Sequence, residues 1–131
     1  MIAVGDDVEE KIFWIDRALL KKYADASGDQ NPIHQDEAFA KSVGLPDVIA
    51  HGMLTMALVG KFVSDWSGGS ASVKEFSARF VKPVIVPAKE RADLTVSAIV
   101  TEIVDGRALL NITATSGGVK VLAMAKALVE I

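Results

Sequence analysis

The stretch of sequence that decides the fold reads Gly52-Met-Leu-Thr-Met-Ala-Leu-Val-Gly-Lys-Phe-Val-Ser-Asp-Trp66. Its apolar side chains recur so closely that a helix built from it has almost no polar face. A helix that is apolar nearly all round is typically a buried helix. At about 1.5 Å of rise per residue it is roughly 22 Å long, enough to cross a small domain. We therefore expect one long central helix with the rest of the chain wrapped around it.

The chain after this helix is rich in strand-forming residues and turn signals. Its β-rich runs are Ala71–Val86, Ala92–Val104, Arg107–Ser116 and Val119–Ile131. The dipeptides Asp105-Gly106 and Gly117-Gly118 between them are typical of two-residue hairpin turns. Within the last run, Ala123–Val129 could equally form a helix by propensity, but we predict a strand because it follows the Gly-Gly turn.

The chain before the central helix predicts one further strand and two helices. Lys11–Ile15 is a short apolar run that fits an edge strand. Asp16 follows as a candidate N-cap for a helix that ends near Gly28, and a shorter helix is expected over Asp36–Val43. Because the strands of the second half are consecutive, these elements predict the α+β class. We expect an antiparallel sheet of about five strands curled around the central helix.

The composition limits the class of protein. The 131 residues include 14 Lys and Arg against 17 Asp and Glu, for a net charge of −3, and no Cys. A chain of this length forms one domain, which we expect to span residues 1–131. The mild negative charge gives no electrostatic footprint for nucleic acid or an anionic membrane, so we expect neither as a partner. Without Cys there are no disulfides, thiolate metal sites or cysteine nucleophile.

The hydropathy pattern predicts a soluble cytoplasmic protein. The first ten residues are acidic, where a secretory signal needs a basic start and then an apolar run. The most apolar window, Val48–Val63, is interrupted by His51 and Lys61. It is also shorter than the roughly 18–20 residues that span a bilayer.

The first candidate for chemistry is the loop segment Ser27–His34, which brings a carboxylate, an amide and an imidazole close together. Catalytic groups concentrate on loops held by rigid elements. Asp29 and His34 can form an acid and base pair, since a carboxylate can orient an imidazole or hold a water with it. Asn31 can fix the loop or that water. An Asx-type turn with a surface histidine explains the same residues equally well, because Asp, Asn, Gly and Pro dominate turns.

The second candidate is Ala50-His-Gly-Met-Leu54, at the expected start of the central helix. The free N–H groups of a helix N-terminus favour developing negative charge. Gly52 lets a substrate carbonyl approach the backbone closely, so its N–H is a candidate oxyanion donor. An ordinary helix start, with His51 as a packed structural residue, is an equally good interpretation.

The sequence predicts no metal site and no cofactor. The ligand positions of a calcium loop are matched by Asp25, Ser27, Asp29, Asn31 and Asp36. However, Gln30 stands where the sharp turn of that loop requires Gly, and its last ligand is Asp rather than Glu. Zinc hydrolase motifs and a phosphate-binding Gly-rich loop are also missing from the sequence.

Taken together and in this order, Ser27–His34 and Ala50–Met56 resemble the motifs of the MaoC-like (R)-specific enoyl-thioester hydratases and dehydratases. The resemblance covers nearly the whole chain, including Val4-Gly-Asp6 and Thr113–Gly118. It is strongest to the catalytic β subunits of (3R)-hydroxyacyl-ACP dehydratases. It implies a hotdog fold and a dimer, either a homodimer or a heterodimer with a related hotdog subunit.

The resemblance also implies a hydro-lyase that adds or removes water across the α,β-bond of an acyl-CoA or acyl-ACP thioester. Carried over by motif, Asp29 and His34 are the catalytic residues that hold the water or hydroxyl. Asn31 supports the loop, and the Gly52 N–H is the oxyanion donor to the thioester carbonyl. One departure from the family pattern is Ala57, where some members carry a Ser.

Two other functions are weighed against this one. A hotdog acyl-thioesterase would release a free thiol, and the hydratase motif argues against it. A non-catalytic acyl-binding partner subunit would not need a catalytic pair. The joint presence of Asp29, Asn31 and His34 argues against that alternative.

Overall fold

A single antiparallel sheet forms the larger layer of the protein. The computed structural model describes residues 1–131, with strand order β1-β3-β4-β6-β2 and the short β5 paired to β4. The strands are β1 (Asp7–Ile15), β2 (Val73–Phe80), β3 (Ala92–Val104), β4 (Arg107–Ser116), β5 (Val119–Lys120) and β6 (Leu122–Glu130). The five longer strands confirm the predicted sheet, and β1 lies at its edge as expected. The run predicted over Val119–Ile131 is divided at Val121 into β5 and β6. Its segment Ala123–Val129, predicted as strand rather than helix, lies in β6, which confirms that choice.

Two tight turns set the pairing of β3, β4 and β5. Val104 pairs with Arg107 across Asp105-Gly106, whose φ angles are 53° and 73°. Positive φ at both central residues is typical of a type I′ turn, whose twist matches that of the flanking strands. Gly117-Gly118, with φ angles of 57° and 77°, joins β4 to β5 in the same way. Both predicted hairpins are therefore present.

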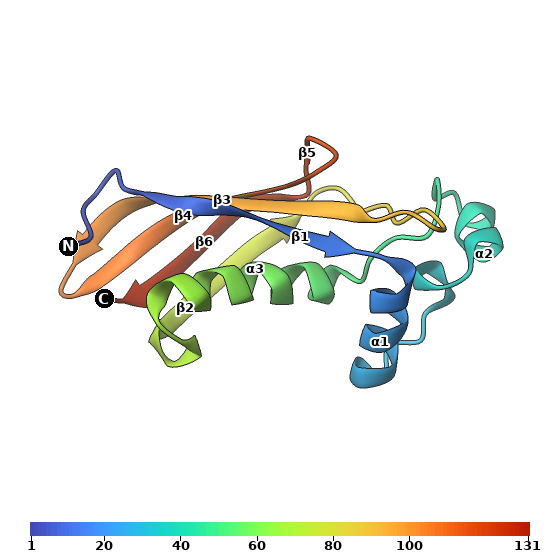
Figure 1. Ribbon diagram of the computed structural model, residues 1–131, viewed down its shortest axis with the longest axis horizontal. Helices are drawn as coiled ribbons and strands as arrows, with labels where there is room; N and C mark the ends of the chain where they lie inside the picture. The colour runs from blue at the N-terminus through green and yellow to red at the C-terminus, as the bar shows by residue number, and fades with distance from the viewer.

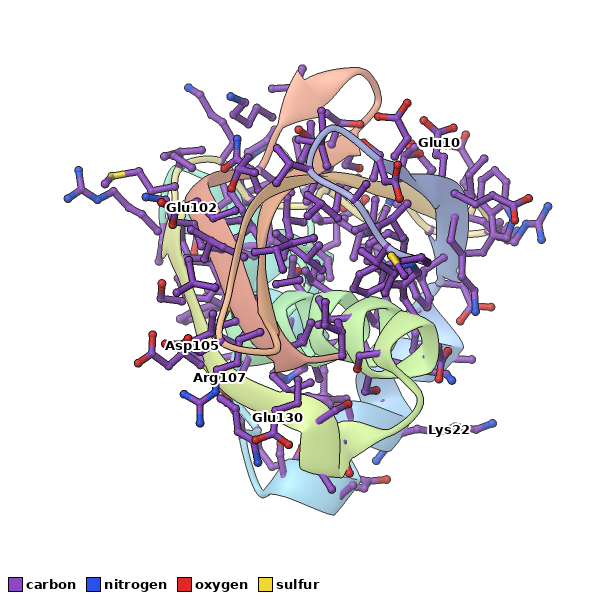
Figure 2. All side chains as sticks on the ribbon, turned by 90° about the vertical axis from the view of Figure 1, so that its left-hand side faces the viewer. Glu10, Lys22, Glu102, Asp105, Arg107 and Glu130 are labelled. Carbon is purple, nitrogen blue, oxygen red and sulfur yellow. The ribbon has the colours of Figure 1, made fainter.

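The sheet curves around the helix α3 (Gly52–Ser67), which lies across its concave face (Figure 1). Figure 2, which looks nearly along this helix, shows the strands passing over it and descending on both sides. Every second residue of β3 from Ala92 to Val100 is buried, because alternate side chains of a strand point to opposite faces. The apolar core therefore lies between the sheet and α3, which is the predicted hotdog arrangement.

The central helix is buried on one side and open on the other, which corrects the prediction of a helix buried all round. Leu54, Val59 and Val63 face the core. Met53 is 63% exposed, and Ala57 on the same side is exposed as well. No contact within the chain explains why this outer side of α3 is apolar. None of the helices is long and apolar enough to cross a membrane.

The strand predicted over Ala71–Val86 is shorter than expected. It begins after a 3-10 turn over Ser70–Ser72 and ends at Phe80. Pro83 has no N–H to donate to a strand ladder, which accounts for the break. The remaining segment runs alongside the chain before α3, where Val86 N–H donates to the Val48 carbonyl at 2.8 Å. This segment becomes one wall of the candidate site.

Three short elements place the polar loop next to the start of α3. They are α1 (Arg17–Ser27), the 3-10 turn Pro32–His34 and α2 (Glu37–Ser42). Asp16 caps α1 by accepting a hydrogen bond from Leu19 N–H at 2.8 Å, and Gly28 ends it with a φ of 81°. Arg17 joins α1 to the chain before α3 through an ion pair with Asp47 at 2.9 Å. The predicted limits of both helices agree with these bounds within one residue.

Candidate active site

A cavity of about 320 Å³ lies at the N-terminal end of α3. Its walls come from the 3-10 turn, the first turn of α3 and the segment after β2, including His34, Gly52, Thr55, Phe80, Lys82 and Val121. The volume is at the lower end of the range for small-molecule sites. Larger hollows lie elsewhere on the surface. One is lined by Val8 and Trp66 among others and another by Glu102 and Leu128 among others, and neither lining includes a histidine.

His34 lines this cavity and has one ring nitrogen free of hydrogen bonds within the chain. The ring is 7% exposed, and its Nδ1 lies 2.7 Å from the Ile49 carbonyl oxygen. Because a carbonyl oxygen only accepts, Nδ1 carries the hydrogen of this bond. The neutral ring therefore has its lone pair on Nε2, which makes no hydrogen bond within the chain. Nε2 is the atom of His34 that can exchange a proton with a bound molecule.

The loop between α1 and the 3-10 turn is held by its own side chains. Asp29 Oδ1 accepts from the Asn31 N–H at 3.1 Å, and Asn31 Oδ1 accepts from the Ile33 N–H at 3.1 Å. These two Asx-type contacts fix the backbone that leads to His34. Asp29 and Asn31 are both exposed, and neither is among the residues that line the cavity. The sequence therefore correctly indicated a turn, and that turn ends in a histidine that faces a cavity.

The carboxylate of Asp29 nevertheless lies close to the imidazole. One carboxylate oxygen of Asp29 and one ring nitrogen each of His34 and His51 all lie within 4.8 Å of one another. A single water can bridge groups at such a separation. The structure thus brings together the two residues predicted to act as a pair, an exposed carboxylate and a buried imidazole.

Gly52 is the first residue of α3 and lines the same cavity as His34. Its N–H donates to no atom of the chain, as is normal for the first turn of a helix. A Cβ added at this position would lie 3.2 Å from the Phe80 ring, so the glycine allows the ring to approach the backbone. A free N–H at a helix N-terminus beside a cavity is suited to bind an oxygen that gains negative charge.

His51 lies directly behind these groups and is 1% exposed. Its ring stacks on that of His34 with 3.9 Å between centroids, and its Nε2–H donates to the Asp29 carbonyl at 3.1 Å. Burial lowers the pKa of His51, and the nearby His34 adds to this effect. The ring is therefore held neutral, which agrees with its interpretation as a packed residue.

The trio of Asp29, His34 and His51 has the residue types of a metal site, and its geometry does not suit one. Rings that stack at an interplanar angle of 25° direct their lone pairs alongside each other rather than toward a common point. A tetrahedral ion needs ligand atoms that converge on it at about 2 Å. The arrangement fits two packed rings next to a carboxylate.

Sequence reasoning did not single out Thr55, Phe80 or Lys82, which also line the cavity. Thr55 follows Gly52 by three residues, so helical spacing alone places both on one face. Phe80 and Lys82 carry no comparable signal, because they reach the cavity through the pairing of β2 with β6. Thr55 is 3% exposed and gives the cavity a hydroxyl group, and Lys82 gives it a positive charge.

The fold and the site define a class of protein: a hotdog domain whose polar loop faces the start of the central helix. The family model described as the MaoC like domain matches residues 3–119 of the chain. The chain therefore belongs to the MaoC-like domain family.

Two curated relatives come from Mycobacterium tuberculosis (strain ATCC 25618 / H37Rv). The 3-hydroxyacyl-thioester dehydratase X is 42% identical over 71 residues, which are 54% of this chain and 24% of that protein. The 3-hydroxyacyl-thioester dehydratase Y is 36% identical over 99 residues, which are 73% of this chain and 31% of that protein. The chain thus spans only about a quarter to a third of the length of these relatives.

Two solved structures are similar over almost the whole chain. A protein named MaoC-like dehydratase superposes with a TM-score of 0.97 at 39% identity, covering 99% of this chain and 41% of that one. An (R)-hydratase from A. caviae involved in PHA biosynthesis superposes with a TM-score of 0.85 at 25% identity. That match covers 99% of this chain and 97% of the hydratase.

Proposed function

We propose that this protein is a hydro-lyase that interconverts trans-2-enoyl thioesters and (3R)-hydroxyacyl thioesters, carried on CoA or on acyl carrier protein. The observation that carries the proposal is the shared cavity of His34 and Gly52. It sets an imidazole Nε2 and a free helix N–H around one space, with the Asp29 carboxylate beside the imidazole. Addition of water to an enoyl thioester needs these three groups.

In the hydration direction, a water molecule is held between the Asp29 carboxylate and His34 Nε2. The water oxygen bonds to C3 of the enoyl group while His34 Nε2 takes one of its protons. The electron pair of the double bond moves to C2 and onto the thioester oxygen, and C2 then receives a proton from the same pair of residues. Dehydration follows the reverse path. General acid and base groups of this kind contribute typically about 10²–10⁴-fold in rate.

The negative charge that develops on the thioester oxygen is the second requirement. Gly52 lines the cavity and its N–H has no acceptor from the chain, while α3 behind it adds its dipole. Loss of one such donor typically lowers the rate by about 10²–10³-fold. The similar proteins include 3-hydroxyacyl-thioester dehydratases and an (R)-hydratase, and this similarity supports the same reaction.

The test is turnover of crotonyl-CoA, followed by loss of the enoyl absorbance and by chiral analysis of the product. Asp29→Asn and His34→Ala are expected to lower kcat by about 10²-fold or more with no loss of folding. Asp36→Asn is the matched control, because Asp36 caps α2 outside the cavity and Asn is an equally good N-cap. Release of free thiol from an acyl-CoA would favour the thioesterase instead.

We further propose that the chain acts as a dimer, with itself or with a related hotdog subunit. The support is the free edge of β2 and the open side of α3. Exposed apolar side chains occur on α3, at the end of β2 and just after it, and on β6, namely Met53, Phe80, Val81 and Met124. Exposed apolar surface of this kind typically marks an interface. The test is the native mass in solution, alone and with candidate hotdog partners, and a monomer under all these conditions contradicts it.

A further inference from the structure

The ring of His51 touches both members of the proposed catalytic pair. It stacks on the His34 ring at 3.9 Å between centroids, and its Nε2–H donates to the Asp29 carbonyl at 3.1 Å. On its other side the Tyr23 ring packs edge-on at 4.8 Å. One buried side chain therefore links α1, the loop that carries Asp29, the 3-10 turn and the start of α3.

The contacts of His51 determine which tautomer it adopts. Because the Asp29 carbonyl only accepts, the hydrogen of the neutral ring is on Nε2. The other nitrogen, Nδ1, is buried without a hydrogen-bond partner. A histidine differs from an apolar residue at this position by its Nε2–H, which satisfies the Asp29 carbonyl.

A neutral ring at this position has a specific benefit for the proposed chemistry. The groups that face it are the His34 imidazole, the Asp29 loop and the Tyr23 ring. If both stacked imidazoles carried a proton, their like charges would repel at 3.9 Å. A neutral His51 lets His34 take up a proton during turnover while the two rings remain stacked.

We propose that His51 is a positioning residue: its ring holds the imidazole of His34 by stacking, and its Nε2–H holds the Asp29 loop, so that the two groups keep a fixed separation. The kinetic consequence rests on the proposed hydratase function. His51 touches no cavity surface, so it acts through its neighbours. Misplacement of a reacting group by about 1 Å can lower the rate about 10²-fold, which sets the size of the expected effect.

Three variants separate the two contacts. His51→Gln keeps a side-chain N–H that can reach the Asp29 carbonyl but loses the stack, whereas His51→Phe keeps the stack but loses the donor. His51→Leu loses both. We expect kcat on crotonyl-CoA to fall about 10²-fold in His51→Leu with little change in KM, and to be partly restored in His51→Gln and His51→Phe. A change in KM alone with kcat unchanged would overturn the proposal. Equal values of kcat in all three variants would overturn it as well.

Imidazole ¹⁵N NMR tests the positioning without any substrate. The chain has two histidines, so each spectrum of a His51 variant shows His34 alone. The wild type should show His34 with its hydrogen on Nδ1 and His51 with its hydrogen on Nε2. In His51→Leu the unstacked His34 ring should shift away from the Ile49 carbonyl, which weakens the Nδ1–H hydrogen bond that fixes its tautomer and lets the second tautomer appear. His51→Gln provides the same comparison if His51→Leu does not fold. An unchanged His34 signal in the variants contradicts the positioning role.

The two measurements also separate the two proposals. A wild-type protein that turns over no enoyl thioester contradicts the proposed function, while the NMR spectra still decide whether His51 positions His34. A wild-type protein that is active, with variants that are folded and equally active, leaves the function standing and contradicts the role of His51.

Discussion

At the scale of single residues, Gly52 combines two roles that a side chain would disturb. Gly52→Ala would add a Cβ at 3.2 Å from the Phe80 ring, at the wall of the cavity. Phe80 is 51% exposed and can move, so we expect normal folding with kcat lowered by about 10-fold or more through a displaced oxyanion donor. Steady-state kinetics with crotonyl-CoA measures this effect.

The matched control for that variant is Gly60→Ala in the same helix. Its added Cβ meets Phe76 at an ordinary contact distance of 3.4 Å, far along α3 from the cavity. Replacement of a helix-interior glycine by alanine stabilises a protein by about 0.4–1 kcal/mol where the site has room. We expect Gly60→Ala to raise the urea midpoint and to leave kcat unchanged. Equal losses of activity in both variants would contradict the role of Gly52.

His51 predicts a pH dependence of stability at the same scale. Burial lowers the pKa of this ring in the folded protein, whereas the unfolded chain titrates near pH 6.5. Between the folded pKa and about pH 6.5, the unfolded state therefore binds more protons than the folded state. The contribution of neutral His51 to the free energy of unfolding is complete above about pH 6.5 and declines as the pH falls toward the folded pKa. Urea unfolding between about pH 7 and pH 5 should show that the free energy of unfolding falls more steeply in the wild type than in His51→Gln. Parallel curves for the two proteins would contradict this assignment.

At the scale of elements, the start of α1 determines where the polar loop begins. The Asp16 carboxylate accepts from the Leu19 N–H at 2.8 Å, as the sequence predicted. Asp16→Ala removes this cap and is expected to lower the free energy of unfolding by about 1 kcal/mol. Asp16→Asn keeps a capping oxygen, so its free energy of unfolding should differ from that of the wild type by only about a few tenths of a kcal/mol. Urea unfolding of the three proteins decides this, and an unchanged midpoint in Asp16→Ala contradicts it.

At the scale of the whole molecule, the open side of α3 predicts an assembly. Met53 is 63% exposed beside the cavity, whereas Val104 is 61% exposed at the β3–β4 turn. Met53→Lys is expected to weaken the proposed dimer, because a charge would be buried against an apolar surface. Val104→Lys is its control and should leave the native mass unchanged. Sedimentation at several concentrations measures both, and an unaffected dimer in Met53→Lys would exclude this face as the interface.

The elements of this fold were largely predictable from local patterns. Asp105-Gly106 and Gly117-Gly118 indicated hairpins because a type I′ turn needs positive φ, which few residue pairs adopt easily. The capping residue Asp16 and the terminating Gly28 marked the ends of α1 for similar local reasons. The early end of β2 at Phe80 was missed, although Pro83 carried the signal that the strand could not continue.

The candidate site was predictable in part. Ser27–His34 showed a turn with a histidine, and Gly52 showed a helix start, because both are short-range features of the chain. The contacts of His51 with His34 and Asp29 join segments separated in sequence, so nothing local indicated them. The same holds for Phe80 and its approach to Gly52.

The sequence by itself determined the turns, the helix limits and the pattern of apolar side chains, because these depend on backbone preferences over a few residues. Tertiary structure alone decided that His34 faces a cavity shared with Gly52, that His51 is packed behind it, and that one side of α3 is left open. Those features depend on how the sheet closes over the helix, and that closure follows from burial of the whole core rather than from any single segment.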